Sequence, residues 1–289
     1  MLTHPYENLS GGEWLRGNLH THTTRSDGTH EPQEVLDMYA DSGYDFFALS
    51  DHDIATTEED YASMDARGMI LIAGNEVTAG GPHILHVYPK SRVTPTWNRQ
   101  DVIHGINSDR GFAVVAHPNF KEFDHCRIDQ LLAWEGYLGL EIYNGILGRT
   151  HGSPYALNHW DRLLSSGRRP WGYAHDDFHD ATKGDLARGW NMVYARERTV
   201  EAIVDALRNG CFYASTGVVI TRITVDGNQV RLETENADRI VVLQELGQRL
   251  SEVDGTTAEV TVPDDARYVR FECWGRGEQF AWTQPFWTR

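Results

Sequence analysis

The chain has 289 residues, of which 40% are hydrophobic and 24% charged, as in an ordinary globular protein. Its formal net charge of −16 argues against a broad nucleic-acid-binding face, because phosphate backbones select basic surfaces. Its three cysteines form no C-x-x-C pair, which argues against a disulfide framework and favours a reducing compartment. Because the sequence shows neither a signal-peptide pattern nor an apolar run of the roughly 18 residues that span a bilayer, we expect a cytoplasmic protein without a membrane partner.

Short apolar segments alternate with helical stretches from residue 15 to about residue 195. We predict strands over 15–20, 46–51, 70–76, 83–88, 112–118, 139–144, 171–177 and 190–195. We predict helices over 32–43, 98–111 and 154–167, and a last one over 199–210. Most of the apolar runs are continuous, which is typical of strands covered on both faces. The series therefore predicts an α/β fold with a parallel sheet, open or closed into a barrel.

The pattern changes after residue 216. Residues 221–234 read as a hairpin around Asp226-Gly227, and 239–245, 258–263 and 268–275 read as further alternating strands. We therefore predict two domains, an α/β domain over 1–216 and a small antiparallel β module over 217–289. All 14 histidines lie at or before His179, which supports two regions with different roles.

Polar clusters follow the predicted strands where each strand ends. They are His20 and His22, Asp51 and His52, Glu76, His117, and Asp177 and His179. In parallel α/β folds this rim is where active sites are built. Residues two apart on an extended segment point to the same side, so the first two histidines can reach one ion.

The same alternation places His175, Asp177 and His179 on one face and turns Asp176 away. Histidine, aspartate and glutamate without thiolates suit Mn²⁺, Zn²⁺ or Fe²⁺, and the candidates exceed what one tetrahedral ion needs. Each cluster alone has an ordinary structural explanation, since Asp27-Gly28 is a turn signal. Their coincidence at successive strand ends favours a site for two or three divalent ions.

These residues, in this order, resemble the PHP (polymerase and histidinol phosphatase) family. The matching motifs are "HTHTTRSDG" at 20–28, "SDHD" at 50–53, "GNE" at 74–76, "AHP" at 116–118 and "DDFH" at 176–179. The resemblance implies a distorted (β/α)7 TIM-like barrel that binds two or three divalent ions and hydrolyses phosphate esters. Residues 206–227 and 281–287 resemble a subgroup that includes carbaryl-hydrolase-like proteins, which append a small β domain.

The resemblance also implies ligand sets for three ions. They are His20, His22, Glu76 and Asp177 for the first, a bridging Glu76 with His117 and either His83 or His86 for the second, and Asp27, His52 and His179 for the third. His83 matches the family's position better than His86. The two lie three residues apart, so on a strand they face opposite sides and only one can serve.

The implied mechanism is attack on phosphorus by a hydroxide that bridges the ions. Asp51, together with the ligands His52 and His179, is a candidate catalytic residue, because it can orient an imidazole or move a proton. The candidate substrate-binding residues are Arg25, Asn144 and His175. Further candidates for phosphate contact are Lys121, Arg149 and Lys183.

Two other functions fit the same residues. The hydroxide can instead attack the carbon of an amide, carbamate or carboxyl ester; an arginine in the metal pocket would favour the phosphoesterase and an uncharged apolar pocket this alternative. The chain can also be a non-catalytic, metal-stabilised binding module with an aromatic face built from Trp274, Trp282 and Trp287. Burial of these tryptophans would argue against the binding face. The expected partner is a small phosphate ester.

Overall fold

The computed structural model describes residues 2–7, 9–120 and 125–288. Its helices are α1 (Pro32–Asp41), α2 (Glu58–Tyr61), α3 (Arg99–Ser108), α4 (Ile128–Ala133), α5 (Leu157–Ser165) and α6 (Val200–Arg208). The four predicted helices are confirmed as α1, α3, α5 and α6. The short α2 and α4 were not predicted; α2 is preceded by its N-cap Thr57, which forms a capping box with Asp60. Among the described residues, no helix has the length and apolar character to cross a bilayer.

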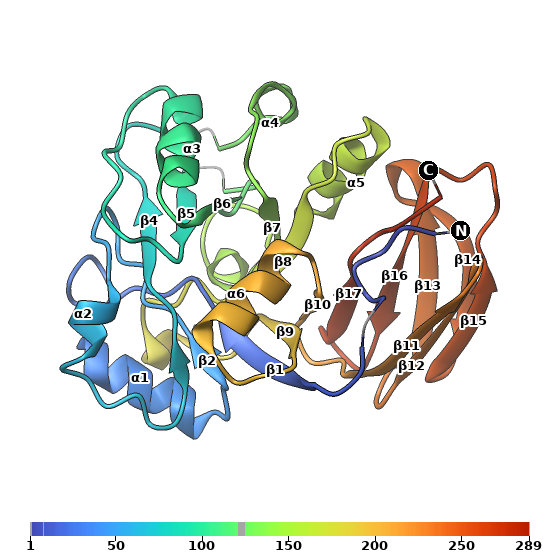
Figure 1. The fold of residues 1–289 in the computed structure, drawn as a ribbon, viewed down its shortest axis with the longest axis horizontal. Helices are drawn as coiled ribbons and strands as arrows, with labels where there is room; N and C mark the ends of the chain where they lie inside the picture. The colour runs from blue at the N-terminus through green and yellow to red at the C-terminus, as the bar shows by residue number, and fades with distance from the viewer. Residues whose placement is uncertain (1, 8, 121–124, 289) are drawn as a thin grey trace.

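The α/β region is built on two groups of strands. In the first, β1 (Glu13–Asn18), β2 (Phe46–Phe47) and β3 (Ile70–Leu71) are parallel, and β9 (Trp190–Ala195) runs antiparallel to β1. The second has the order β4 (Gly74–Val77), β5 (Ile84–Val87), β6 (Phe112–Val115), β7 (Gly139–Asn144) and β8 (Trp171–His175). The helices cover the outside of these strands, with α1 packed on Phe47 and Leu49 (Figure 1).

The predicted all-parallel sheet is wrong in this second group. Residues 78–83 join β4 to β5 directly, and so short a connection forces the two strands to run antiparallel. Because β5 is thereby reversed, it also runs antiparallel to β6, whereas β6, β7 and β8 are parallel. Among the described residues the strand ladder does not close into a barrel, although isolated bridges such as His52 to Glu76 and Thr21 to Phe178 link the two groups.

The C-terminal strands continue the first sheet. From β9 it passes through β10 (Phe212–Ser215), β17 (Phe280–Thr283), β16 (Tyr268–Trp274), β13 (Arg239–Gln244) and β14 (Gln248–Asp254), and β18 (Phe286–Trp287) pairs with β16. A separate sheet of β11 (Ile220–Asp226), β12 (Gln229–Thr234) and β15 (Thr257–Thr261) packs across a shared hydrophobic core. Leu2 and Tyr6 join that core, and both chain ends lie at this module (Figure 1).

The tryptophans of the C-terminal module are used for packing. Trp282 and Trp287 are 1% and 2% exposed, and Trp274 is partly buried with its indole N–H donating to Glu272 Oε1. This burial argues against an aromatic binding face on the module.

Candidate metal centre

The segment from His20 to Gly28 is held against the rim by a buried carboxylate. Asp51 accepts hydrogen bonds from the backbone N–H and the hydroxyl of Thr23, at 2.8 and 2.9 Å, and from the hydroxyl of Ser26 at 2.7 Å. Gly28 fits because a Cβ at this position would lie 2.5 Å from the carbonyl oxygen of His22. The Asp51 carboxylate therefore orients this loop, and its predicted catalytic role stays a prediction.

His20 and His22 direct their Nε2 atoms at two carboxylates. His20 Nε2 lies 3.2 Å from both Glu76 Oε1 and Asp177 Oδ1, and His22 Nε2 lies 3.1 Å from Asp177 Oδ1. Both Nε2 atoms are buried and make no hydrogen bond to a described residue. Because buried polar atoms are normally paired, two orphaned nitrogens that face carboxylates fit a cation between them. This donor set without thiolates suits Mn²⁺, Zn²⁺ or Fe²⁺.

Glu141, which the sequence did not point out as a site residue, stands behind this first cluster. Its Oε1 lies 2.6 Å from His20 Nδ1 and 2.7 Å from His175 Nδ1, and its Oε2 accepts from the backbone N–H of His117 at 2.6 Å. Burial by itself raises the pKa of Glu141, but His20 and His175 lower it. An ionised carboxylate only accepts, so His20 Nδ1 carries a hydrogen, and Nε2 is the atom directed at Glu76 and Asp177.

A second cluster forms on the other side of Glu76. His83 Nδ1 and His117 Nε2 each lie 3.1 Å from Glu76 Oε1. The structure thus places His83, and not His86, at the centre: the buried His86 points away, with Nε2 3.5 Å from Asp109. His125, which was not predicted, joins His83 and His117 in a group whose ligand atoms all lie within 4.8 Å of one another. His125 follows the "AHP" motif by a few residues, and its spacing from the other candidate ligands did not indicate that it belongs to the site.

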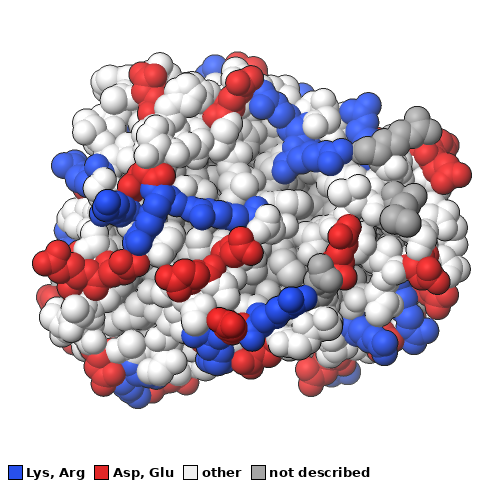
Figure 2. All heavy atoms as spheres, viewed as in Figure 1, with Lys and Arg blue, Asp and Glu red and all other residues white. Residues whose placement is uncertain are grey.

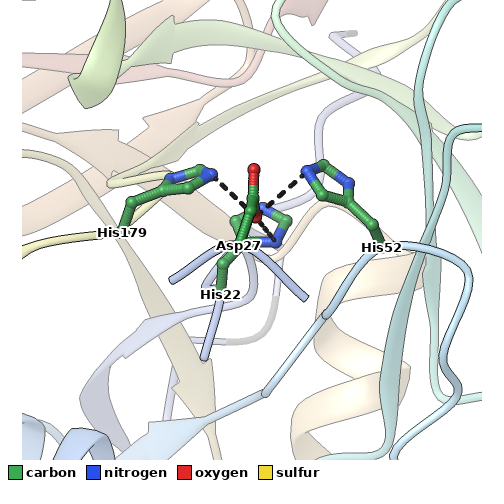
Figure 3. A group of neighbouring side chains, drawn as sticks. All are labelled: His22, Asp27, His52 and His179. Atoms are coloured by element: carbon green, nitrogen blue, oxygen red, sulfur yellow. Dashed lines mark ion pairs between the residues drawn. The ribbon is translucent and has the colours of Figure 1, made fainter. Parts of the chain in front are cut away.

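A third cluster surrounds Asp27, as Figure 3 shows. His52 Nε2 and His179 Nε2 approach Asp27 Oδ1 from either side at 3.4 and 3.3 Å, and His22 Nδ1 lies 3.8 Å away. His52 also reaches Glu76, with Nδ1 2.8 Å from Oε2. Through Glu76 and His22 the three clusters form one continuous site, and the structure brings together all nine residues predicted as ligands.

Two of these ligands have strained backbones. His117 and Asp177 follow β6 and β8 with φ of 26° and 54°, in a region that non-glycine residues rarely adopt. Such strain costs on the order of 1–3 kcal/mol and gathers at functional sites. Asp176 faces away from the clusters, as predicted, and accepts from the hydroxyl of Tyr39 at 2.6 Å.

The predicted substrate-binding residues contact other side chains of the protein. His175 is completely buried and is held by Glu141, and Asn144 donates to Glu141 and to Asp177 Oδ2 at 2.8 and 3.1 Å. Arg25 donates to the hydroxyl of Thr56 at 3.3 Å. Their roles in substrate binding stay predictions.

The other predicted phosphate contacts are also engaged. Arg149 forms a bidentate pair with Asp185, with both N–O distances at 2.6 Å, and Lys183 lies 3.3 Å from Asp180. Lys121 lies outside the described residues.

A cavity of about 280 Å³ opens onto the clusters. Its described lining combines ligands with apolar side chains: Asp27, His52, His83, His117, Phe120, Ile146, Leu147, Thr150, Asp177 and His179. No lysine or arginine belongs to this described lining. An anionic group in the cavity would therefore depend on bound cations for its neutralisation.

The electrostatics of the cluster favour cations. Burial alone raises the pKa values of Glu76 and Asp177, but the surrounding imidazoles, His20 foremost, lower both well below the ordinary range. Burial, reinforced by His179, lowers the pKa of His22 to about 4, so its ring is neutral near pH 7. Although burial lowers them, the pKa of His20 is raised well above its ordinary value by Asp177 and Glu76, and that of His52 is raised to about 11 by Glu76 and Asp27. Without a metal these two rings therefore carry protons, which a bound cation would displace.

Comparisons with known proteins bear on the fold. Neither the family models nor the curated proteins that were searched match this chain. The structure is similar to that of a two-domain protein from Bacteroides vulgatus, described as containing a predicted PHP-like metal-dependent phosphoesterase. The TM-score is 0.57 at 17% identity, over 98% of this chain and 89% of that one. At this identity the likeness shows a shared fold, which extends over the α/β region and the C-terminal strands.

Weaker likenesses exist to two other solved structures. One is a lesion-specific endonuclease from Pyrococcus furiosus, with TM-score 0.47 and 16% identity over 68% of this chain and 56% of that one. The other is an amidohydrolase from Chromobacterium violaceum, with TM-score 0.43 and 20% identity over 58% of this chain and 88% of that one. Both scores are too low to support an argument about this chain.

Proposed function

We propose that this chain is a metal-dependent hydrolase of the PHP family that cleaves a small phosphate ester. The observation that carries the proposal is the convergence of three carboxylate–imidazole clusters on Glu76, with orphaned Nε2 atoms on His20 and His22. The description of the Bacteroides vulgatus protein, whose fold this chain shares, supports the same reaction class.

The residues of the chain would divide the work. His20, His22, Glu76 and Asp177 would hold one ion, Glu76 with His83, His117 and His125 a second, and Asp27 with His52 and His179 a third. When bound, such ions act as Lewis acids and lower the pKa of a coordinated water. Glu141 fixes the tautomer and the direction of His20, and Asn144 fixes the outer oxygen of Asp177. His52 and His179 also line the cavity, so as ligands they would place the third ion beside the substrate.

The surface supports a small substrate. On the face that Figure 2 shows, basic and acidic side chains are interspersed, and this face offers no continuous basic track for a phosphate backbone.

A second candidate function is hydrolysis of an amide, carbamate or carboxyl ester. The lining of the cavity at the clusters favours this second function. Its apolar walls, without a described lysine or arginine, also suit an uncharged substrate. In the phosphoesterase, the ions themselves must neutralise the phosphate oxygens.

A paired assay separates the two functions. Protein reconstituted with Mn²⁺ is assayed with phenyl phosphate and bis(4-nitrophenyl) phosphate, and in parallel with phenyl N-methylcarbamate. We expect turnover of a phosphate ester and a loss of at least about a hundredfold in kcat/KM for His20→Ala, with His159→Ala unchanged as a control. Turnover of the carbamate alone would favour the second candidate, and full activity of His20→Ala would reject the metal site as the active site.

A further inference from the structure

The cavity of about 280 Å³ at the three clusters is called the metal cavity from here on. A second cavity, of about 490 Å³, adjoins it. We call it the indole cavity; it is lined by His52, Thr78, Ala79, Gly80, Gly81, His83 and Trp97. Two of these residues, His52 and His83, also line the metal cavity. A molecule held in the indole cavity therefore extends directly to the metal ligands.

Trp97 forms an unusually exposed wall of this cavity. Its side chain is 87% exposed, although tryptophan is usually largely buried because its indole carries a large apolar surface. The indole is not on a loose segment. Asn98 caps α3 immediately after it, and a Cβ at Gly80 would lie 3.4 Å from the backbone nitrogen of Trp97. The backbone that carries the indole is thus packed against the loop across the cavity.

That opposite loop, residues 78–81, is clamped from two sides. Asp53 accepts from the backbone N–H groups of Thr78 and Ala79, each at 3.0 Å. The buried Arg99 donates through Nη2 to the carbonyl oxygens of the same residues at 2.7 and 3.0 Å. Gly81 lies against Arg99, where a Cβ would come 2.8 Å from Nε. The cavity wall is therefore preformed and presents glycine backbone, which leaves room for a flat group.

We propose that the indole cavity receives a planar aromatic group of the substrate, with Trp97 against its face. This assignment rests on the proposed function, and it narrows the substrate to an ester of an aromatic alcohol or one with an aromatic ring near the phosphate. Apart from the two histidines, the described lining carries no ionisable side chain, so the group is uncharged. The volume lies within the range of small-ligand sites, and stacking on an indole adds to the affinity gained by burying the aromatic surface.

Binding of two phosphonates tests this without requiring turnover. Calorimetric titration of Mn²⁺-loaded protein with phenylphosphonate and methylphosphonate should show at least about tenfold tighter binding of the phenyl compound. Trp97→Ala should abolish that difference and leave the methylphosphonate affinity unchanged, and Trp97→Phe should retain part of it. Leu246→Ala, which removes another exposed apolar side chain, should change nothing.

The outcomes separate this inference from the proposed function. Equal phenylphosphonate affinity in wild type and Trp97→Ala, or equal affinities of the wild type for phenylphosphonate and methylphosphonate, would overturn the aromatic site. Binding of neither phosphonate would overturn the phosphate site, and this inference with it. If the phenyl preference is present and depends on Trp97, but no phosphate ester is hydrolysed, the aromatic site stands and the phosphoesterase proposal fails.

Discussion

Glu141 shows how one buried carboxylate can orient a candidate metal ligand. It accepts from the Nδ1 atoms of His20 and His175 and from Asn144 Nδ2, so three side chains are ordered by one buried carboxylate. A carboxylate behind a histidine ligand fixes the ring's tautomer and increases its basicity. The first cluster therefore depends on Glu141 as much as on the atoms that would contact the ion.

We predict that Glu141→Gln weakens metal binding by about tenfold to a hundredfold. The amide replaces one accepting oxygen with an NH₂ group, which would face other donors inside a buried site. Competition with a chromophoric chelator for Zn²⁺ measures the change. Glu252→Gln, the same substitution at an exposed position, serves as the control. Equal affinities of Glu141→Gln and wild type would show that His20 needs no such support.

Acid should destabilise the fold through His86, which lies outside the metal clusters. Burial lowers its pKa to about 4 from an ordinary 6.5, despite the opposing effect of Asp109. A histidine whose pKa is lower in the folded state gives stability above pH 6.5 that is lost as the pH falls toward 4. Over that window the wild type should lose about 3 kcal/mol more of its free energy of unfolding than His86→Gln.

Urea unfolding at several pH values measures this difference. His104→Gln, a substitution at an exposed position of α3, should follow the wild-type curve. Parallel pH profiles of wild type and His86→Gln would contradict the prediction.

The sequence predicted which residues form the site better than it predicted what each one does. His20 and His22 could be predicted because alternation within a short segment governs them, and His52, Glu76, His117, Asp177 and His179 because they follow strands. Asp27 and His83 came only from the family resemblance. The contacts of Asp51 and His175 could not be predicted, because their partners, Thr23 and Glu141, come from other elements. Which of its neighbours a buried polar side chain meets is decided by tertiary packing, which no local spacing records.

At the level of elements, the sequence predicted where strands lie along the chain, but it did not predict in which direction every strand runs in its sheet. Residues 139–144 and 190–195 are the predicted strands β7 and β9 without a shift, since their apolar runs end sharply. The reversal of β5 depends on the short Gly80-Gly81 connection, which also builds the indole cavity. This one tight turn therefore makes β5 antiparallel, where a parallel strand was expected, and it also shapes the proposed substrate site.

The contact between α5 and β16 rests on a buried ion pair. Arg270, 1% exposed, donates through Nε and Nη2 to Asp161 at 2.8 and 2.7 Å. We predict that Asp161→Ala lowers the free energy of unfolding by about 3 kcal/mol, because it leaves the guanidinium buried with only Glu272 at 3.4 Å. Thermal and urea unfolding measure the loss.

An exposed ion pair gives the matched control. Arg239→Ala breaks the pair with Asp254 on the surface of the C-terminal module and should leave the free energy of unfolding nearly unchanged, because exposed ion pairs contribute little to stability. If Asp161→Ala is as stable as Arg239→Ala, the buried pair does not hold the two elements together.

At the scale of the whole molecule, one sheet runs through both predicted domains. It passes from β3 at one edge to β14 at the other, and residues at both chain ends pack beside each other through the bridge between Thr3 and Trp287. The change of pattern near residue 216 marked a real change from helix-covered strands to a β module. It could not reveal the shared sheet, because pairing between distant strands leaves no local signal in a sequence.

The central claim is that the clusters around Glu76 bind metal, and elemental analysis of the purified protein tests it most directly. After reconstitution with Mn²⁺ and removal of free metal, we predict about two or three ions per chain in the wild type. In Glu76→Ala most of this metal should be lost, because that carboxylate faces all three clusters. A wild-type protein without bound metal, or a Glu76→Ala variant with the wild-type number of ions, would contradict the account.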